Sequence, residues 1–147
     1  ASYGGVTTAV KGQLPDVDPQ ARISSWDELE SYEGPRQKAF AERSGDLMPM
    51  SMIIHAINDY GQQCKWHRDD NGKFTVRPIQ GATLPQSLRG LNLVATAETG
   101  SGKTMCFAVV AIAAVVVAKK CPQVLIMAHN RPLLDQLCDE MDKLCKS

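Results

Sequence analysis

The sequence of 147 residues lacks the features that mark several special classes of protein. Its 16 basic and 16 acidic side chains cancel, which excludes a strongly basic protein that coats nucleic acid by charge alone. Its five cysteines include no C-x-x-C pair and suggest no disulfide framework, so we expect an intracellular, reducing compartment such as the nucleus or the cytoplasm. No signal peptide opens the chain, and its longest apolar run, residues 105–118, is shorter than the roughly 20 residues of a membrane span. We therefore expect no membrane partner.

Charge is unevenly distributed along the chain. Residues 1–60 carry 5 basic and 9 acidic side chains, whereas residues 61–147 carry 11 and 7, so the net charge changes from −4 to +4. A positive second part indicates an anionic ligand there. The chain opens on Ala1 and stops at Ser147 inside a helical pattern, which leads us to expect a fragment or a processed product.

Residues 1–46 mix Gly, Pro, Ser and charged side chains with few large apolar ones, and no helical or strand period persists in them. This composition predicts an acidic, poorly ordered N-terminal arm. The apolar cluster of Trp26, Leu29 and Tyr32 is either a short segment that binds a protein partner or a partly buried turn.

Residues 47–147 have the pattern of an ordered domain. Apolar side chains recur at helical spacing from Met50 to Ile57, and Gly61 is the expected end of that helix. Residues 62–73 are polar and rich in turn formers, and a short helix is expected over residues 78–89.

Alternating strands and helices are expected after that point. Residues 91–97 and 123–128 have the composition of strands, and residues 104–120 that of a buried helix, for which a buried strand is the competing interpretation. Asn130 is the expected N-cap of a last helix, which has one apolar face. That face consists of Leu133, Leu137, Met141 and Leu144. The order of these elements predicts an α/β fold, a parallel sheet with flanking helices.

The glycine-rich segment before residues 104–120 has the composition of a phosphate-binding loop. It consists of Ala97, Glu98, Thr99, Gly100, Ser101, Gly102, Lys103 and Thr104, all of which we expect to surround the phosphates. The two glycines allow a tight turn with inward N–H groups, and the following helix adds the positive end of its dipole. Lys103 supplies a positive charge for the β- and γ-phosphates, and Thr104 a hydroxyl for Mg²⁺.

Two segments in register resemble motifs of the DEAD-box RNA helicases. The loop resembles the first motif of that family, with Ala97 where other phosphate loops have glycine. Upstream, the stretch Pro78-Ile79-Gln80, with Leu84-Pro85 and Leu88-x-Gly90 after it, resembles the family's adenine-recognising Q motif. The resemblance runs from about residue 50 to the C-terminus, with the Q motif region over about 50–80. It implies the N-terminal portion of a RecA-like, ATP-binding P-loop NTPase domain.

Gln80 is the residue that the resemblance assigns to adenine. An amide donates and accepts at once, which suits the N6 and N7 edge of adenine, whereas guanine presents acceptors at both places. The alternative is a side chain that only binds the backbone at the start of its own helix. The family usually has Pro-Thr where this chain has Val76-Arg77. An aromatic contact with adenine, from Phe74 or from Phe40, is undecided.

The stretch Ala128-His129-Asn130-Arg131-Pro132-Leu133-x-x-Gln136 is similar to the next motif of the family, which contacts the RNA backbone. Asn130 and Pro132 depart from its usual Thr and Glu. The resemblance implies that Arg131 touches RNA, since a guanidinium at a helix start suits phosphate. An ordinary surface ion pair is the alternative.

The acidic motif that holds Mg²⁺ and orients water for hydrolysis is not recognisable. Residues 139–142 fit D-E-x-D, but they lie in the last amphipathic helix, and we interpret them as a solvated helix face. We expect part of an ATP-dependent RNA helicase that binds nucleotide, with Lys103 and Thr104 as its catalytic side chains, but does not hydrolyse it alone. Two other hypotheses stay open: a different P-loop NTPase, such as a DNA helicase, and a non-catalytic interaction module.

Overall fold

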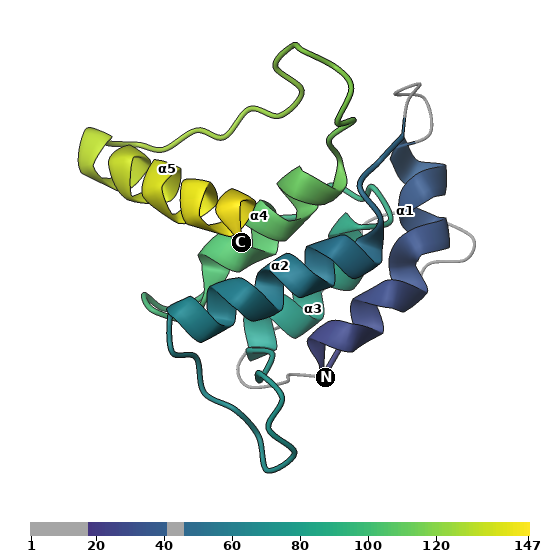
Figure 1. Cartoon of the computed structure of the whole chain (residues 1–147), viewed down its shortest axis with the longest axis vertical. Coiled ribbons are helices and arrows are strands. Elements are labelled where there is room, and N and C mark those ends of the chain that lie inside the picture. Colours follow the sequence, from purple (N-terminus) through teal and green to yellow (C-terminus); the bar gives the residue numbers. More distant parts are fainter. Residues whose placement is uncertain (1–17, 41–45) are drawn as a thin grey trace.

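A bundle of helices makes up the computed structural model, which describes residues 18–40 and 46–147. Its elements are the 3-10 helix η1 (Trp26–Tyr32) and the α-helices α1 (Glu33–Phe40), α2 (Met50–Gln63), α3 (Pro78–Ser87), α4 (Lys103–Ala113) and α5 (Arg131–Lys146). Helix α2 crosses the middle of the molecule and packs against η1, α4 and α5, while α3 packs against α4 (Figure 1). Within the described ranges, no helix is both long and apolar enough to cross a bilayer.

Helix α2 confirms the predicted apolar periodicity, because Met50, Ile53, Ile54 and Ile57 are all buried. Its end was predicted wrongly: the helix continues past Gly61 to Gln63. A Cβ atom on Gly61 would lie 2.8 Å from the Trp66 ring and 3.2 Å from Phe74. Gly61 therefore lets two aromatic rings pack directly against the helix backbone and does not end the helix.

The prediction of a loosely attached arm is wrong for residues 18–40. Trp26, Leu29 and Tyr32 are buried in the core, so they form a packed turn rather than a free segment for a partner. The Trp26 ring stacks on Trp66 with 5.8 Å between the ring centres. Burial of these aromatic surfaces stabilises the packed arrangement, and the 3.6-residue test missed it because η1 is a 3-10 helix. Residues 1–17 and 41–45 of the predicted arm lie outside the described part of the chain.

The N-terminal segment is also hydrogen-bonded to α3. Ile23 N–H donates to Gly81 O over 3.2 Å, and the buried Gln86 side chain donates to Asp18 O over 3.0 Å. These bonds satisfy polar groups that would otherwise be buried without partners. Residues 18–40 therefore pack against α3, although the sequence predicted a boundary between an arm and a domain near residue 47.

A buried guanidinium joins α1 to two other helices. Arg36 is fully buried, donates to Met48 O over 2.8 Å and to Ala113 O over 3.2 Å, and forms an ion pair with Glu33. The second carboxylate oxygen of Glu33 accepts from Met50 N–H over 2.8 Å. Burial raises the pKa of the Glu33 carboxyl, but hydrogen bonds from Arg36, Met50 and Gln37 outweigh that effect and leave this pKa below its ordinary value. The pair thus holds the start of α2 and the end of α4 against α1.

The predicted parallel sheet is not formed by the described residues. Residues 91–97 and 123–128 belong to no strand, and the only β-type pairings in residues 18–40 and 46–147 are isolated bridges. Val94, Leu125 and Met127 are 95%, 81% and 83% exposed. Parallel strands are stable when neighbouring strands bind their backbone and helices cover both faces, and these two segments have neither.

Helix α4 is shorter than predicted. It ends at Ala113, before the run Val115–Val117, and Val116 instead lies in an isolated antiparallel bridge with Leu47. The Gln123 side chain accepts from Val116 N–H and donates to Val116 O, each over 2.9 Å. Because an amide satisfies both backbone groups of Val116, the chain can leave the helix without burying an unpaired polar group.

Helix α5 confirms its predicted start. The Asn130 side chain accepts from Leu133 N–H over 2.9 Å, which caps the first turn. Leu137 and Leu144 are the buried residues of the helix. Asp139 and Asp142 are exposed within it, in agreement with the interpretation of residues 139–142 as a helix face.

Replacing Arg36 with alanine should lower the free energy of unfolding by about 3 kcal/mol, because Glu33 and the carbonyls of Met48 and Ala113 lose a buried partner. Urea unfolding followed by circular dichroism measures this. The matched control is Lys38→Ala on the exposed surface of the same helix, with an expected change within about 0.5 kcal/mol. Equal stability of the two variants would contradict a structural role for Arg36 and its partners.

Candidate functional site

The loop of residues 97–104 lies between an extended segment and the first turn of α4. Gly100 and Gly102 have φ angles of +80° and +88°, in the left-handed region that favours glycine. Gly102 is the N-cap of α4, and Lys103 is the first residue of the helix. The backbone thus has the tight turn and the helix start that the sequence predicted.

Lys103 folds back onto its own loop. Its ammonium group donates to Ala97 O and to Glu98 O, each over 2.6 Å. These carbonyls bind the charge in place of an anion. A negatively charged ligand that offers stronger, charge-assisted bonds would compete directly with them for the ammonium group.

The Ser101 hydroxyl is the second polar group of interest. Its oxygen is buried, and no atom of the described residues forms a hydrogen bond with it. A buried polar atom without a partner costs free energy, and such atoms often belong to sites that a ligand completes. The hydroxyl therefore fits a loop built around a polar ligand.

Gln80 lies against the loop from the neighbouring helix. Its side chain is buried, accepts from Arg77 N–H over 2.9 Å and donates to Gly102 O over 3.1 Å. The backbone bond at the helix start that was the alternative interpretation is therefore present, together with a link to the loop. One N–H and one oxygen lone pair of the amide are not used by these bonds.

Arg77, noted in the sequence only as a departure from a motif, also reaches the loop. Its guanidinium donates to Gly100 O. Arg77 is the N-cap of α3, so helix α3 presents two side chains, those of residues 77 and 80, to the same loop. No local sequence signal indicated this contact, because the partner lies 23 residues away.

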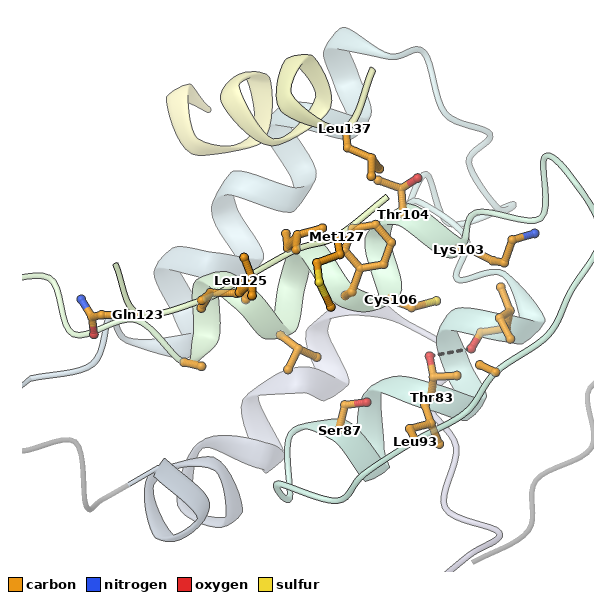
Figure 2. A pocket seen from close by; sticks show the side chains of 18 of the residues that line it. Thr83, Ser87, Leu93, Lys103, Thr104, Cys106, Gln123, Leu125, Met127 and Leu137 are labelled. Atoms are coloured by element: carbon orange, nitrogen blue, oxygen red, sulfur yellow. Dashed lines mark hydrogen bonds between the residues drawn. The ribbon is translucent and has the colours of Figure 1, made fainter. Parts of the chain in front are cut away.

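An apolar cavity of about 870 Å³ lies beside α4. Its lining includes Phe40, Phe107, Leu125 and Met127, and its walls come from α3, α4, α5 and the two extended segments. Thr104, the predicted Mg²⁺ residue, also lines this cavity. Figure 2 shows that Lys103 stands at the border of this cavity with its ammonium group directed away from the apolar side chains. The cavity is therefore not where a triphosphate would bind, since its surface offers mainly apolar groups.

Neither candidate aromatic residue shows an open face next to Gln80. Phe74 is buried, packs edge-on against Trp66, and has the Arg68 guanidinium 3.9 Å from the centre of its ring. Phe40 lines the apolar cavity. The structure therefore gives neither ring a position suited to stacking on a base held by Gln80.

Two further groups define the surroundings of the site. Burial raises the pKa of the Cys106 thiol, so this side chain in the first turn of α4 stays protonated near neutral pH and is a poor nucleophile.

Arg131 is 86% exposed at the start of α5 and lies 3.5 Å from Asp135. The surface ion pair that was its alternative interpretation is thus present, and the exposed guanidinium remains accessible to a ligand.

The chain is similar in sequence to proteins of one family. Residues 77–147 match the family described as DEAD/DEAH box helicase. The ATP-dependent RNA helicase DeaD of Haemophilus influenzae is 34% identical over 101 residues, or 69% of this chain and 15% of that protein. The protein of the same name from Escherichia coli K12 is 30% identical over 107 residues, or 73% and 15%. The ATP-dependent rRNA helicase RRP3 of Lodderomyces elongisporus is 39% identical over 70 residues, or 48% and 14%.

The chain spans about 15% of the length of the DeaD relatives that it matches. No solved structure matches it. The match confirms the resemblance that the loop and the Q motif indicated, and the matched region starts at Arg77, so it contains α3, the loop, α4 and α5.

The two loop glycines offer a matched pair of substitutions. A Cβ on Gly102 would lie 2.6 Å from Gln80 Nε2 and 2.9 Å from Arg77 Cδ, whereas one on Gly100 would meet no atom within 4 Å. Both variants carry the cost of alanine at positive φ, about 1 kcal/mol. Gly102→Ala should lose about 1 kcal/mol more, because the Gln80 bond must break. Urea unfolding of both variants measures the difference, and equal losses would contradict the close packing of Gln80 on the loop.

Proposed function

Because residues 77–147 belong to the DEAD/DEAH box helicase family, we propose that this chain binds ATP and Mg²⁺ through residues 97–104. The observation that carries the proposal is the loop itself: two glycines with left-handed backbone angles precede Lys103, which opens a helix and donates from its ammonium group to two loop carbonyls. In the intact protein we propose that ATP hydrolysis is coupled to RNA duplex unwinding or to remodelling of RNA–protein complexes. That activity belongs to the full-length enzyme.

The residues of the loop fit a triphosphate. Backbone N–H groups and the N-terminus of α4 would meet the phosphate oxygens, and Lys103 would exchange its bonds to Ala97 O and Glu98 O for bonds to the β- and γ-phosphates. The unpartnered Ser101 hydroxyl would gain a partner. Thr104, the second residue of α4, lines the apolar cavity and would turn its hydroxyl toward the loop to bind Mg²⁺.

Gln80 is proposed to read the base. The donor and acceptor that remain on its amide match the N7 and N6 edge of adenine, and guanine would present two acceptors to the same groups. Since the same amide binds Gly102 O, recognition of the base and shape of the phosphate loop would depend on one side chain.

Arg131 is proposed to contact the RNA backbone. It is exposed at the first position of α5, where the positive end of the helix dipole adds to its charge. The excess of basic side chains in residues 61–147 supports an anionic partner for this part of the chain.

By itself this chain is proposed to bind nucleotide without hydrolysing it. Hydrolysis in this class of enzyme needs a carboxylate that holds Mg²⁺ and a group that orients water. The sequence that fits D-E-x-D, residues 139–142, lies inside α5, where Asp142 pairs with Lys146. A carboxylate on a solvated helix face does not provide that geometry.

Replacing Lys103 with alanine should weaken MgATP binding about a hundredfold, because the mobile charge for the β- and γ-phosphates is lost. Isothermal titration calorimetry with the 147-residue chain measures this. The control is Lys120→Ala, which removes the same charge from an exposed turn and should leave the affinity unchanged. If the affinity of Lys103→Ala equals that of the unmodified chain, the loop is not the phosphate site.

Replacing Gln80 with alanine should reduce the preference for ATP over GTP. Loss of the bond to Gly102 O should loosen the loop and weaken the binding of both ATP and GTP. The ratio of the two dissociation constants therefore measures base recognition separately from the effect on the loop. We expect that ratio to approach unity, measured by the same calorimetric titrations. A preserved ratio with weaker binding of both nucleotides would limit Gln80 to shaping the loop.

A further inference from the structure

Two side chains of α3 hold alternate carbonyls of the phosphate loop. Arg77 donates from its guanidinium to Gly100 O, and Gln80 donates from its amide to Gly102 O. Helix α3 also packs along α4, the helix that the loop opens. The loop is therefore fastened to α3 at two of its peptide groups.

Fixing a carbonyl also fixes the N–H of the next residue. A trans peptide group is planar, and its C=O and N–H point in opposite directions. The bond from Arg77 to Gly100 O thus directs Ser101 N–H away from α3. On that side Ser101 N–H donates to Glu98 O over 3.3 Å, and Lys103 binds the same oxygen. Ser101 N–H and the Lys103 ammonium group consequently converge on one place inside the loop.

The glycines make this restraint necessary. Gly100 has no side chain and adopts φ +80°, a conformation that only glycine takes without strain, so the peptide between residues 100 and 101 has little intrinsic barrier against turning over. In the turned orientation the Gly100 carbonyl would face the interior of the loop, where it would repel an anion. A Cβ on Gly100 would meet no atom within 4 Å, so packing does not prevent that rotation.

We propose that Arg77 is a positioning residue for phosphate binding: its guanidinium holds the 100–101 peptide so that Ser101 N–H faces the anion. The inference rests on the proposed function of the loop. The aliphatic stem of Arg77 lies beside Gly102, with Cδ 2.9 Å from the place where a Cβ would be. This contact places the guanidinium next to the loop, where one of its N–H groups donates to the Gly100 carbonyl.

The test uses Arg77→Met in the 147-residue chain, because methionine keeps much of the stem beside Gly102 and removes the donor. Affinities for ATP, ADP and AMP are measured by calorimetry at low and at high salt. Amide hydrogen exchange of residues 98–103 is measured without nucleotide. Lys38→Ala, which removes an exposed charge from α1, is the control for net charge.

A positioning role predicts a loss of about tenfold in affinity for both ATP and ADP, with AMP unaffected, since the loop binds the β-phosphate that ATP and ADP share. The loss should be the same at both salt concentrations, because the bond removed is to a neutral carbonyl. Exchange of the loop amides should become faster in Arg77→Met and stay unchanged in Lys38→Ala.

Three results would overturn the proposal. A loss confined to ATP would indicate contact with the γ-phosphate, and a loss that disappears at high salt would indicate direct attraction between charges. Unchanged exchange of the loop amides would show that Arg77 does not restrain the loop. Failure of the unmodified chain to bind any nucleotide would instead count against the proposed function, and the exchange measurement would still decide whether Arg77 holds the loop. If Arg77→Met does not fold, Arg77→Gln serves as the second variant with the same readouts.

Discussion

The ion pair of the buried Arg36 with the partly exposed Glu33 connects parts of the chain that lie far apart in sequence. Arg36 binds the carbonyl at the end of α4, and Glu33 binds the first N–H of α2. Each charge therefore lies at the helix end whose dipole it complements. Because α4 carries the loop of residues 97–104 at its other end, the position of this loop depends on a guanidinium at the opposite end of the helix. Arg36 is fully buried, so removing any of its partners is costly, and the pair stabilises the packing around it.

Helix α4 is thus held at both ends by side chains from other helices. Arg36 fixes its C-terminal end, while Gln80 and Arg77 fix the loop at its N-terminal end. Between these points the helix packs through Met105, Ala108 and Val109, which are buried. The loop is accordingly shaped without a ligand, and the Lys103 ammonium group and Ser101 N–H, which both bind Glu98 O, are the groups that would change partners on binding. Such preorganisation lowers the cost of ordering the loop on binding.

The extended segments 91–97 and 123–128 show the limit of local sequence patterns. Their side chains have the composition of buried strands, yet Val94 and Leu125 stand almost fully in solvent. A strand is stabilised by neighbours that bind its backbone and by surfaces that cover its faces, and the described residues supply neither. The composition of these segments therefore favours strands, but a strand forms only where a partner strand is present to bind its backbone.

The sequence by itself determined the elements whose causes are local. The apolar spacing of Met50, Ile53 and Ile57 predicted α2, Asn130 predicted the start of α5, and the glycines of the loop predicted its tight turn, because each effect acts between residues a few positions apart. Only the tertiary structure decided that Trp26 would stack on Trp66, that Arg36 would be buried, and that Arg77 would reach Gly100. These contacts join residues that are 23 or more positions apart, or depend on which helix surfaces meet, and a polar side chain has many possible partners until those surfaces are in place.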